Sequence, residues 1–126
     1  MMSDSYVLQQ APFVIPTTDG KLIEEHVGCA VSNEPEVSVA HMVAPPGWSE
    51  PHQNPEFDEY TMMVRGRKQI EIDGETVTLN VGESLLVRKG ARVRYSNPFD
   101  VEAEYWSVCM PAFSPDLVNR EEDSGS

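Results

Sequence analysis

Basic residues are scarce in this sequence. Nine lysines and arginines stand against 21 aspartates and glutamates, so the formal net charge of the 126 residues is −12. Because the phosphates of nucleic acid would be repelled by such a chain, the charge argues against DNA or RNA as a partner. The lysines and arginines cluster at 65–68 and 88–94, where we expect turns and outward-facing positions. Small neutral or weakly charged molecules therefore suit this protein better than phosphate-rich ligands.

Long apolar runs and cysteines are scarce as well. No apolar run approaches the roughly 18 residues of a membrane-spanning helix, so we expect no membrane partner. The first residues, MMSDSYVLQQAP, lack the basic region and the apolar core of a secretory signal. Only Cys29 and Cys109 carry thiols, and they lie 80 positions apart. We interpret both as reduced, buried thiols of a cytoplasmic protein.

A long helical pattern is also missing, because ten prolines and eight glycines divide the chain into short segments. Between these breaks apolar and polar residues alternate, which indicates β-strands. Asp73-Gly74 lies between two such runs and predicts a tight hairpin. The expected strands cover residues 13–15, 26–31, 37–44, 59–65, 67–73, 76–80, 84–87, 92–96 and 101–110. Many short strands with frequent turns predict an all-β sandwich or barrel in a single domain.

Two stretches have the spacing of a known pair of motifs. The first contains Gly47, His52, Asn54, Glu59 and Gly66, with six residues between the glutamate and the last glycine. It resembles the first motif of the cupin superfamily, which reads Gly, His-x-His, Glu and Gly. The gap between Gly47 and His52 is one residue shorter than is usual in that family.

The second stretch resembles the second cupin motif, which reads Gly, Pro-x-Gly, His and Asn. Gly82 and Gly90 occupy the glycine positions, and Asn97 occupies the last position. Arg88 stands in the place of the proline and Val93 in the place of the histidine. The resemblance thus extends to both motifs, although its ligand positions are altered.

The resemblance implies a single-domain cupin of the RmlC-like bacterial type. Such a protein is all-β and forms an antiparallel double-stranded β-helix, also called a jelly-roll barrel. We expect an N-terminal arm with the first strands over residues 1–36 and the barrel over 37–113. A polar tail, with room for a single helical turn, would cover 114–126.

The resemblance also implies a divalent-metal site with an incomplete ligand set. Cupin sites bind Mn, Fe, Ni, Zn or Cu through three histidines and a glutamate. Here His52 and Glu59 keep two of these ligands, Asn54 replaces one histidine with a weaker amide oxygen, and Val93 cannot bind a metal. The resemblance therefore implies a reduced site for Mn, Fe, Ni or Zn.

His41 is the histidine that could complete this site. The more apolar line of the strand expected over 37–44 contains it together with Val37, Val39 and Val43. Because alternate residues of a strand share a face, we expect this line to face the barrel interior. His41 would then join His52 and Glu59 as a metal ligand. The alternative is an interior histidine hydrogen-bonded to a neighbour.

Glu59 and Tyr95 are candidates for proton transfer even without a metal. A lone interior carboxylate is costly unless it is paired, protonated or metal-bound, and its two charge states can serve as acid and base. In the second motif Tyr95 shares the inward face of Val93 and Asn97, where its hydroxyl could reach a ligand. The predicted catalytic residues are therefore Glu59, His52 and Tyr95.

The last expected strand has one line of small residues and one line of large apolar residues. The first line contains Val101, Ala103, Tyr105, Ser107 and Cys109, and we expect it to face the cavity. The second contains Trp106 and Met110, which would lie on the outer face with Met62 and Val64. This apolar outer face, together with the habit of the family, implies a homodimer.

Three functions remain open from the sequence. The first is a metal-dependent enzyme, of lyase, isomerase or oxygenase type, acting on a small carbonyl or carboxylate compound. The second is a metal-free epimerase- or isomerase-like cupin in which a histidine and a tyrosine move protons. The third is a non-catalytic module that binds a small ligand. The motif resemblance itself predicts that the side chains of His52 and Glu59 lie within about 5 Å of each other inside the barrel.

Overall fold

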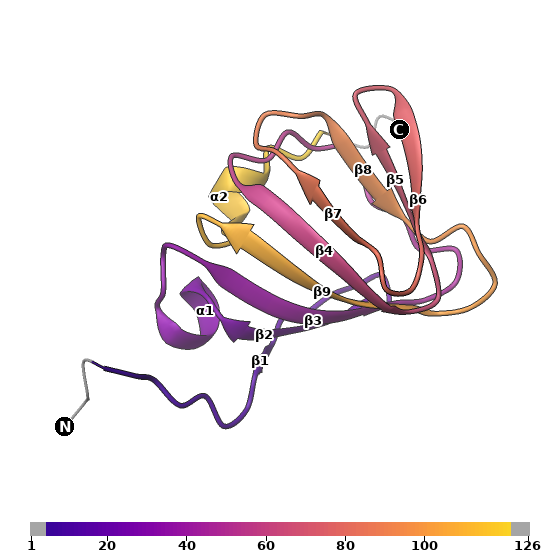
Figure 1. The fold of residues 1–126 in the computed structure, drawn as a ribbon. Helices are drawn as coiled ribbons and strands as arrows, with labels where there is room; N and C mark the ends of the chain where they lie inside the picture. Colours follow the sequence, from indigo (N-terminus) through magenta and orange to yellow (C-terminus); the bar gives the residue numbers. More distant parts are fainter. Residues whose placement is uncertain (1–4, 122–126) are drawn as a thin grey trace.

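The computed structural model describes residues 5–121 and shows two antiparallel sheets that face one another (Figure 1). The larger sheet has the strand order β1-β2-β3-β9-β4-β7 and the smaller has the order β6-β5-β8. The strands are β1 Phe13–Val14, β2 Leu22–Val27, β3 Ser38–Ala44, β4 Asp58–Arg65, β5 Lys68–Ile72, β6 Glu75–Leu79, β7 Ser84–Val87, β8 Val93–Ser96 and β9 Ala103–Met110. Within the described residues, two single-turn helices, α1 Cys29–Ser32 and α2 Pro115–Val118, lie outside the sheets. The predicted all-β jelly-roll fold is confirmed.

The core forms where alternate side chains of both sheets point toward each other. β9 shows the alternation clearly, because Ala103, Tyr105, Ser107 and Cys109 are buried while the residues between them are partly exposed. The facing side chains of the core cluster include Ala44, Met63, Ile70, Leu79, Val87, Val93 and Tyr95. The inward orientation predicted for the second motif is confirmed. That of the β9 line is confirmed except at Val101, which precedes the strand and is 49% exposed.

One expected strand is partly a helix. The sequence predicts a strand over 26–31, whereas the structure has β2 ending at Val27 and α1 beginning at Cys29. The carboxylate of Glu25 causes this change, since it accepts hydrogen bonds from the backbone N–H groups of Ala30 and Val31 at 2.9 and 3.0 Å. Residues of the first helical turn need such acceptors, and a buried carboxylate supplies them.

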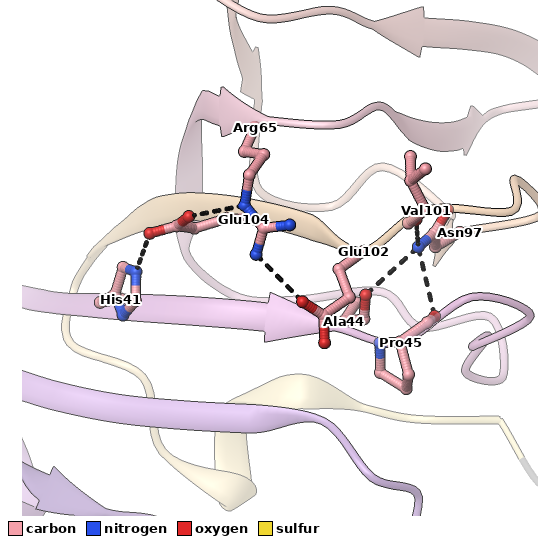
Figure 2. A network of polar contacts seen from close by, with 8 residues as sticks. All are labelled: His41, Ala44, Pro45, Arg65, Asn97, Val101, Glu102 and Glu104. Carbon is pink, nitrogen blue, oxygen red and sulfur yellow. Dashed lines mark hydrogen bonds and ion pairs between the residues drawn. The ribbon is translucent and has the colours of Figure 1, made fainter.

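The side chain of Asn97 connects the end of β3 with the turn between β8 and β9. Its side-chain amide donates to the carbonyl oxygens of Ala44, Pro45 and Val101 at 3.2, 3.2 and 2.9 Å (Figure 2). Its Oδ1 accepts a hydrogen bond from the N–H of Phe99 at 3.2 Å. Because these bonds tie the end of β3 to the turn between β8 and β9, the last residue of the second motif has a structural role.

Gly66, the last residue of the first motif, connects β4 and β5 at a tight corner. Its φ is +77°, and a Cβ at this position would lie 2.1 Å from the carbonyl oxygen of Glu102. Gly74, in the confirmed hairpin between β5 and β6, has a similar φ of +87°, but a Cβ added there would meet no heavy atom within 4 Å. The two glycines thus differ in steric contact and share the same backbone conformation.

Replacing each glycine with alanine separates these two effects. We expect Gly74→Ala to lower the free energy of unfolding by about 1 kcal/mol, the cost of a positive φ in a residue with a Cβ. Gly66→Ala should lower it by roughly 3 kcal/mol or more, because the corner must also move away from Glu102. Urea unfolding of both variants measures the difference, and equal losses would show that the contact at Glu102 is unimportant.

Candidate functional site

A cavity of about 100 Å³ lies between the two sheets. Its apolar walls come from Ile15, Ile23, Ala40, Met42, Phe57 and Phe113, and its polar groups from Lys21, Glu50, Gln53, Glu59, Lys68, Tyr95 and Ser107. It adjoins an outer chamber of about 350 Å³. The residues that line both spaces are Ile15, Lys21, Ile23, Glu50, Phe113 and Arg120. Together the two spaces have the size and the mixed lining of a small-molecule site.

The buried ammonium group of Lys68 is the main feature of the cavity. β5 places Lys68 on the same inward line as Ile70, and the residue is only 1% exposed. Its Nζ lies 3.6 Å from the ring centroid of Tyr105 and 4.2 Å from that of Tyr95. Among residues 5–121, no hydrogen-bond acceptor or ion-pair partner contacts this group. Burial, together with the positive charge of Lys21, lowers the pKa of Lys68.

A second ammonium group, that of Lys21, faces the same tyrosine. Its Nζ lies 5.4 Å from the ring centroid of Tyr105 and 4.2 Å from that of Trp48. Although burial opposes the change, interactions with Tyr105 and Glu50 raise the pKa of Lys21. The pKa values of the two lysines are therefore shifted in opposite directions, so the protonated form is more favourable for Lys21 than for Lys68.

Two carboxyl groups line the same cavity as these cations. Glu59 accepts a hydrogen bond from the hydroxyl of Ser107 at 2.6 Å, and this contact is buried. Glu50 lies nearer the outer chamber, with an Oε2 3.6 Å from the guanidinium of Arg120. Burial raises the pKa of Glu50, so its protonated form is more favourable than that of an exposed glutamate. The cavity thus offers carboxyl groups in two different environments.

The hydroxyls of Tyr95 and Tyr105 are buried, and neither has a hydrogen-bond partner in the described part of the chain. Burial raises the pKa of Tyr95 well above its usual value, so this hydroxyl remains a proton donor. Burying a hydroxyl without a partner is costly. A bound molecule with a hydrogen-bond acceptor would remove that cost.

The structure separates the residues that the sequence analysis places in one site. Glu59 and Tyr95 line the cavity, whereas His41, His52 and Asn54 do not. The Nε2 of His52 lies 3.1 Å from Glu71, whose side chain is on the outward line of β5. Asn54 uses its backbone carbonyl to accept a hydrogen bond from Asn119. The assignment of His52, Asn54 and Glu59 as metal ligands remains a prediction, and the structure does not bring them together.

A register difference of one residue explains this separation. The buried positions before β4 are Gln53, Pro55 and Phe57, and they continue the line of Glu59. With the gap after Gly47 that is usual in the family, the first histidine position of the motif falls on Gln53, and Gln53 lines the cavity. The gap from Gly47 to His52 is one residue shorter than usual. This difference is the signal in the sequence that Gln53, and not His52, takes the first histidine position of the motif.

The orientation predicted for β3 is wrong. Ser38, Ala40 and Met42 line the cavity, and His41 lies on the opposite face, where its ring packs 5.1 Å from that of Trp106. Its nitrogens lie 2.8 Å from Glu24 and 2.7 Å from Glu104. Figure 2 shows the contact of His41 with Glu104, which Arg65 also contacts. The apolar line of β3 thus faces the outside of the barrel.

The donor set of the cavity does not fit the metal site that the family implies. At the three histidine positions stand Gln53, Pro55 and Val93, of which only the glutamine offers a donor atom. Among residues 5–121, no three His, Cys, Asp or Glu side chains are grouped to hold a metal ion. The ammonium groups of Lys21 and Lys68 would also repel a divalent cation placed beside Glu59.

Sequence reasoning missed the cations of the cavity and one feature of the cysteines. The sequence analysis expects Lys68 at a turn or on an outward position, although it alternates with Ile70 and Ile72, and this alternation is the signal for its burial.

Cys29 is exposed, contrary to prediction, whereas Cys109 is buried as expected. Burial raises the pKa of the Cys109 thiol, so this group is a poor nucleophile.

Comparison with known protein families matches residues 40–109 to the cupin domain. The chain belongs to the cupin family. It is 48% identical, over 108 residues, to a Myxococcus xanthus protein named endoribonuclease YbeY. That match covers 86% of this chain but only 37% of the relative, so the chain spans little more than a third of that protein.

Solved structures agree with this cupin assignment. An RmlC-like cupin from Shewanella frigidimarina has a TM-score of 0.71 at 14% identity, and the match covers 91% of this chain and 97% of that one. The EutQ protein of Clostridium difficile has a TM-score of 0.61 at 23% identity, covering 73% and 63% of the two chains. At these identities the likeness shows the fold alone.

In the described residues of this cupin, no helix is long and apolar enough to cross a membrane.

The contacts of His41 predict a pH-dependent contribution to stability. Although partial burial opposes it, hydrogen bonds with Glu104 and Glu24 raise the pKa of His41. The folded state therefore favours the charged imidazole, and this stabilisation is complete below the unfolded pKa of about 6.5. It is lost as the pH rises through the higher pKa of the folded protein. Hydrogen bonds from His41 and Arg65 lower the pKa of Glu104, so stabilisation is also lost in acid.

We expect the stability advantage of the wild type over His41→Gln to fall by about 1 kcal/mol between roughly pH 6 and pH 9. Urea unfolding at a series of pH values measures it. His26→Gln is the matched control, because His26 packs 5.3 Å from the same Trp106 but has no carboxylate partner among the described residues. An advantage that does not change with pH would rule out a charged His41.

Proposed function

We propose that this cupin binds a small carbonyl or carboxylate compound in its interior cavity and transfers a proton on it without a metal ion. The main support is the buried ammonium group of Lys68, which lines the cavity with Glu59 and Tyr95 and has no acceptor among the described residues. The reaction class that this arrangement favours is isomerisation or lysis next to a carbonyl group.

Lys68 and Lys21 would provide the positive charge that a metal ion provides in cupins with a complete set of histidine and glutamate ligands. A proton removed from the carbon beside a carbonyl leaves negative charge on the carbonyl oxygen. A fixed cation in a site shielded from water stabilises that charge strongly. Because their Nζ atoms lie 3.6 and 5.4 Å from the centroid of the same Tyr105 ring, both lysines are placed to act on one small molecule.

Glu59 and Tyr95 would move the proton. The Glu59 carboxylate, held by Ser107, would accept the proton from carbon, and the Tyr95 hydroxyl would donate a hydrogen bond to the substrate oxygen. Return of the proton to another carbon completes an isomerisation, and departure of a group from the next carbon completes a lysis. His52 has no part in this scheme, because its ring nitrogen contacts Glu71 outside the cavity. Binding without turnover would instead identify a non-catalytic ligand-binding cupin.

Lys68→Met tests the role of the buried charge at nearly unchanged side-chain length. We expect the affinity for small 2-oxo acids such as pyruvate to fall about 100-fold, because the charge-assisted contact of Lys68 with the carbonyl oxygen is lost, and we expect Glu59→Gln to remove turnover while leaving binding. Calorimetry measures binding, and proton exchange into deuterated water measures proton transfer on carbon.

Lys89→Met is the matched control, because Lys89 is an exposed lysine. Elemental analysis of protein purified without chelator completes the test. Near-stoichiometric metal that disappears in Glu59→Gln, or unchanged binding by Lys68→Met, would contradict the proposal.

We further propose a homodimer through the outer face of β4 and β9. Tyr60, Met62 and Val64 on β4 are between 36 and 46% exposed, and Met110 on the neighbouring β9 is 48% exposed. Adjacent exposed apolar side chains of this kind are typical of contact surfaces. The homodimer predicted from the sequence thus has a defined candidate surface.

Met62→Glu would place a charge at the centre of that surface. We expect it to shift the protein from dimer to monomer in sedimentation-velocity experiments, with a dissociation constant raised at least about 100-fold. Val101→Glu, at a 49% exposed apolar residue in the turn before β9, is the control and should leave the assembly unchanged. A wild-type monomer at all concentrations would refute the dimer.

A further inference from the structure

We propose that Lys68 is a nucleophile that forms an imine with the carbonyl carbon of a small 2-oxo acid, whose carboxylate Lys21 and Arg120 hold. This inference rests on the proposed function, since it names the substrate class and the covalent chemistry of the same cavity. It assigns different tasks to the two cavity lysines.

The surroundings of Lys68 are those of a reactive amine. Buried lysines in proteins are normally paired with a carboxylate, because an unpaired ammonium group is costly in a low-dielectric interior. Lys68 instead lies between two tyrosine rings, at 3.6 and 4.2 Å from their centroids, without an ion-pair partner in the described residues. Burial and the charge of Lys21 lower the pKa of Lys68, which increases the fraction of neutral amine. A neutral amine has the lone pair that attacks a carbonyl carbon.

Other potential nucleophiles of the cavity are unsuitable. The Cys109 thiol faces the same space, but burial raises its pKa, so thiolate is strongly disfavoured. The Ser107 hydroxyl donates its hydrogen to Glu59 at 2.6 Å, and no histidine lines the cavity to act as its base. Among the described cavity residues, the Lys68 amine is thus the best nucleophile.

The position of Lys21 and Arg120 determines which end of the ligand faces outward. Both residues line the inner cavity and the outer chamber, whereas Lys68 lines only the inner cavity. Interactions with Tyr105 and Glu50 keep Lys21 protonated. A 2-oxo acid would therefore enter with its carboxylate between these cations and its carbonyl carbon toward Lys68. The inner volume of about 100 Å³ limits the ligand to a short chain there.

The reaction of the Lys68 amine with the carbonyl group gives the imine and one molecule of water, and nothing else is formed. The Lys68 nitrogen bonds to the carbonyl carbon while the carbon–oxygen double bond becomes a single bond, and the oxygen takes a proton. A second proton on that hydroxyl lets it leave as water when the carbon–oxygen bond breaks. The carbon–nitrogen double bond forms at the same time, and over the whole sequence the nitrogen gives up its two hydrogens. Glu50, whose pKa burial raises, lines the same space and can donate protons to the oxygen. No oxidant or reductant takes part.

Borohydride trapping of the full chain with pyruvate tests the imine. Hydride reduces a carbon–nitrogen double bond to a stable secondary amine, so the adduct can be located by peptide mapping. The chain has three lysines, Lys21, Lys68 and Lys89, and mapping also distinguishes them from the N-terminal amine. We expect labelling of Lys68 to be at least about 10-fold faster than that of Lys21 or Lys89.

Variants extend the test beyond the wild type. Lys68→Arg keeps the charge and should abolish the adduct, and Lys89→Met should leave its rate unchanged. Lys21→Met should slow trapping of pyruvate about 10-fold and leave trapping of uncharged propanal nearly unchanged. Circular dichroism confirms that each variant is folded. Equal labelling of all three lysines, or labelling that excludes Lys68, would overturn the imine.

Binding measured without borohydride separates the two proposals. Trp48 lies beside the ammonium of Lys21, so its fluorescence reports a carboxylate held in the outer chamber. Pyruvate that binds without labelling Lys68 would overturn the imine and leave metal-free binding in place. Failure of pyruvate both to bind and to label would overturn both proposals.

Discussion

The structure of the site depends on the burial of one positive charge. Lys68 is 1% exposed, and the free energy of moving an ammonium group out of water must be offset by its surroundings. Two tyrosine rings provide part of this compensation through their electron-rich faces. Electrostatic interactions with Glu59 and Glu50 favour the charged form of Lys68, although neither carboxyl group contacts the ammonium directly. The tyrosines, the carboxyl groups and the lowered pKa of Lys68 therefore form one arrangement.

The cupin fold does not depend on this arrangement. Gly66 allows the close approach of the β4–β5 corner to Glu102, and Asn97 ties β3 to the turn before β9. Both residues belong to the family motifs and neither contributes to the chemistry of the cavity. The motifs thus combine residues that build the barrel with residues that bind a ligand. In this chain the first group is kept and the second is replaced at Gln53, Pro55 and Val93.

Much of the fold could be predicted from local patterns. Alternation in β9 correctly predicted that Ser107 and Cys109 face the cavity, and the spacing of the second motif did the same for Tyr95. Alternation failed in β3, because Val39 and Val43 are apolar but lie on the outer face of the sheet with His41. A strand at the centre of a sheet can carry apolar residues on both faces, so hydrophobicity alone does not identify the inner one.

The sequence by itself determined the family, the all-β architecture and the place of Glu59 and Tyr95 in the interior. These follow from residue spacing and strand periodicity, which are local properties. Only the tertiary structure decided that Gln53 replaces His52 in the cavity and that Lys21 and Lys68 meet at Tyr105. Lys21 precedes β2, Lys68 begins β5, and Tyr105 lies in β9, so no short motif connects them. Their proximity arises because the two sheets close over one interior, which brings distant charges into the same low-dielectric space.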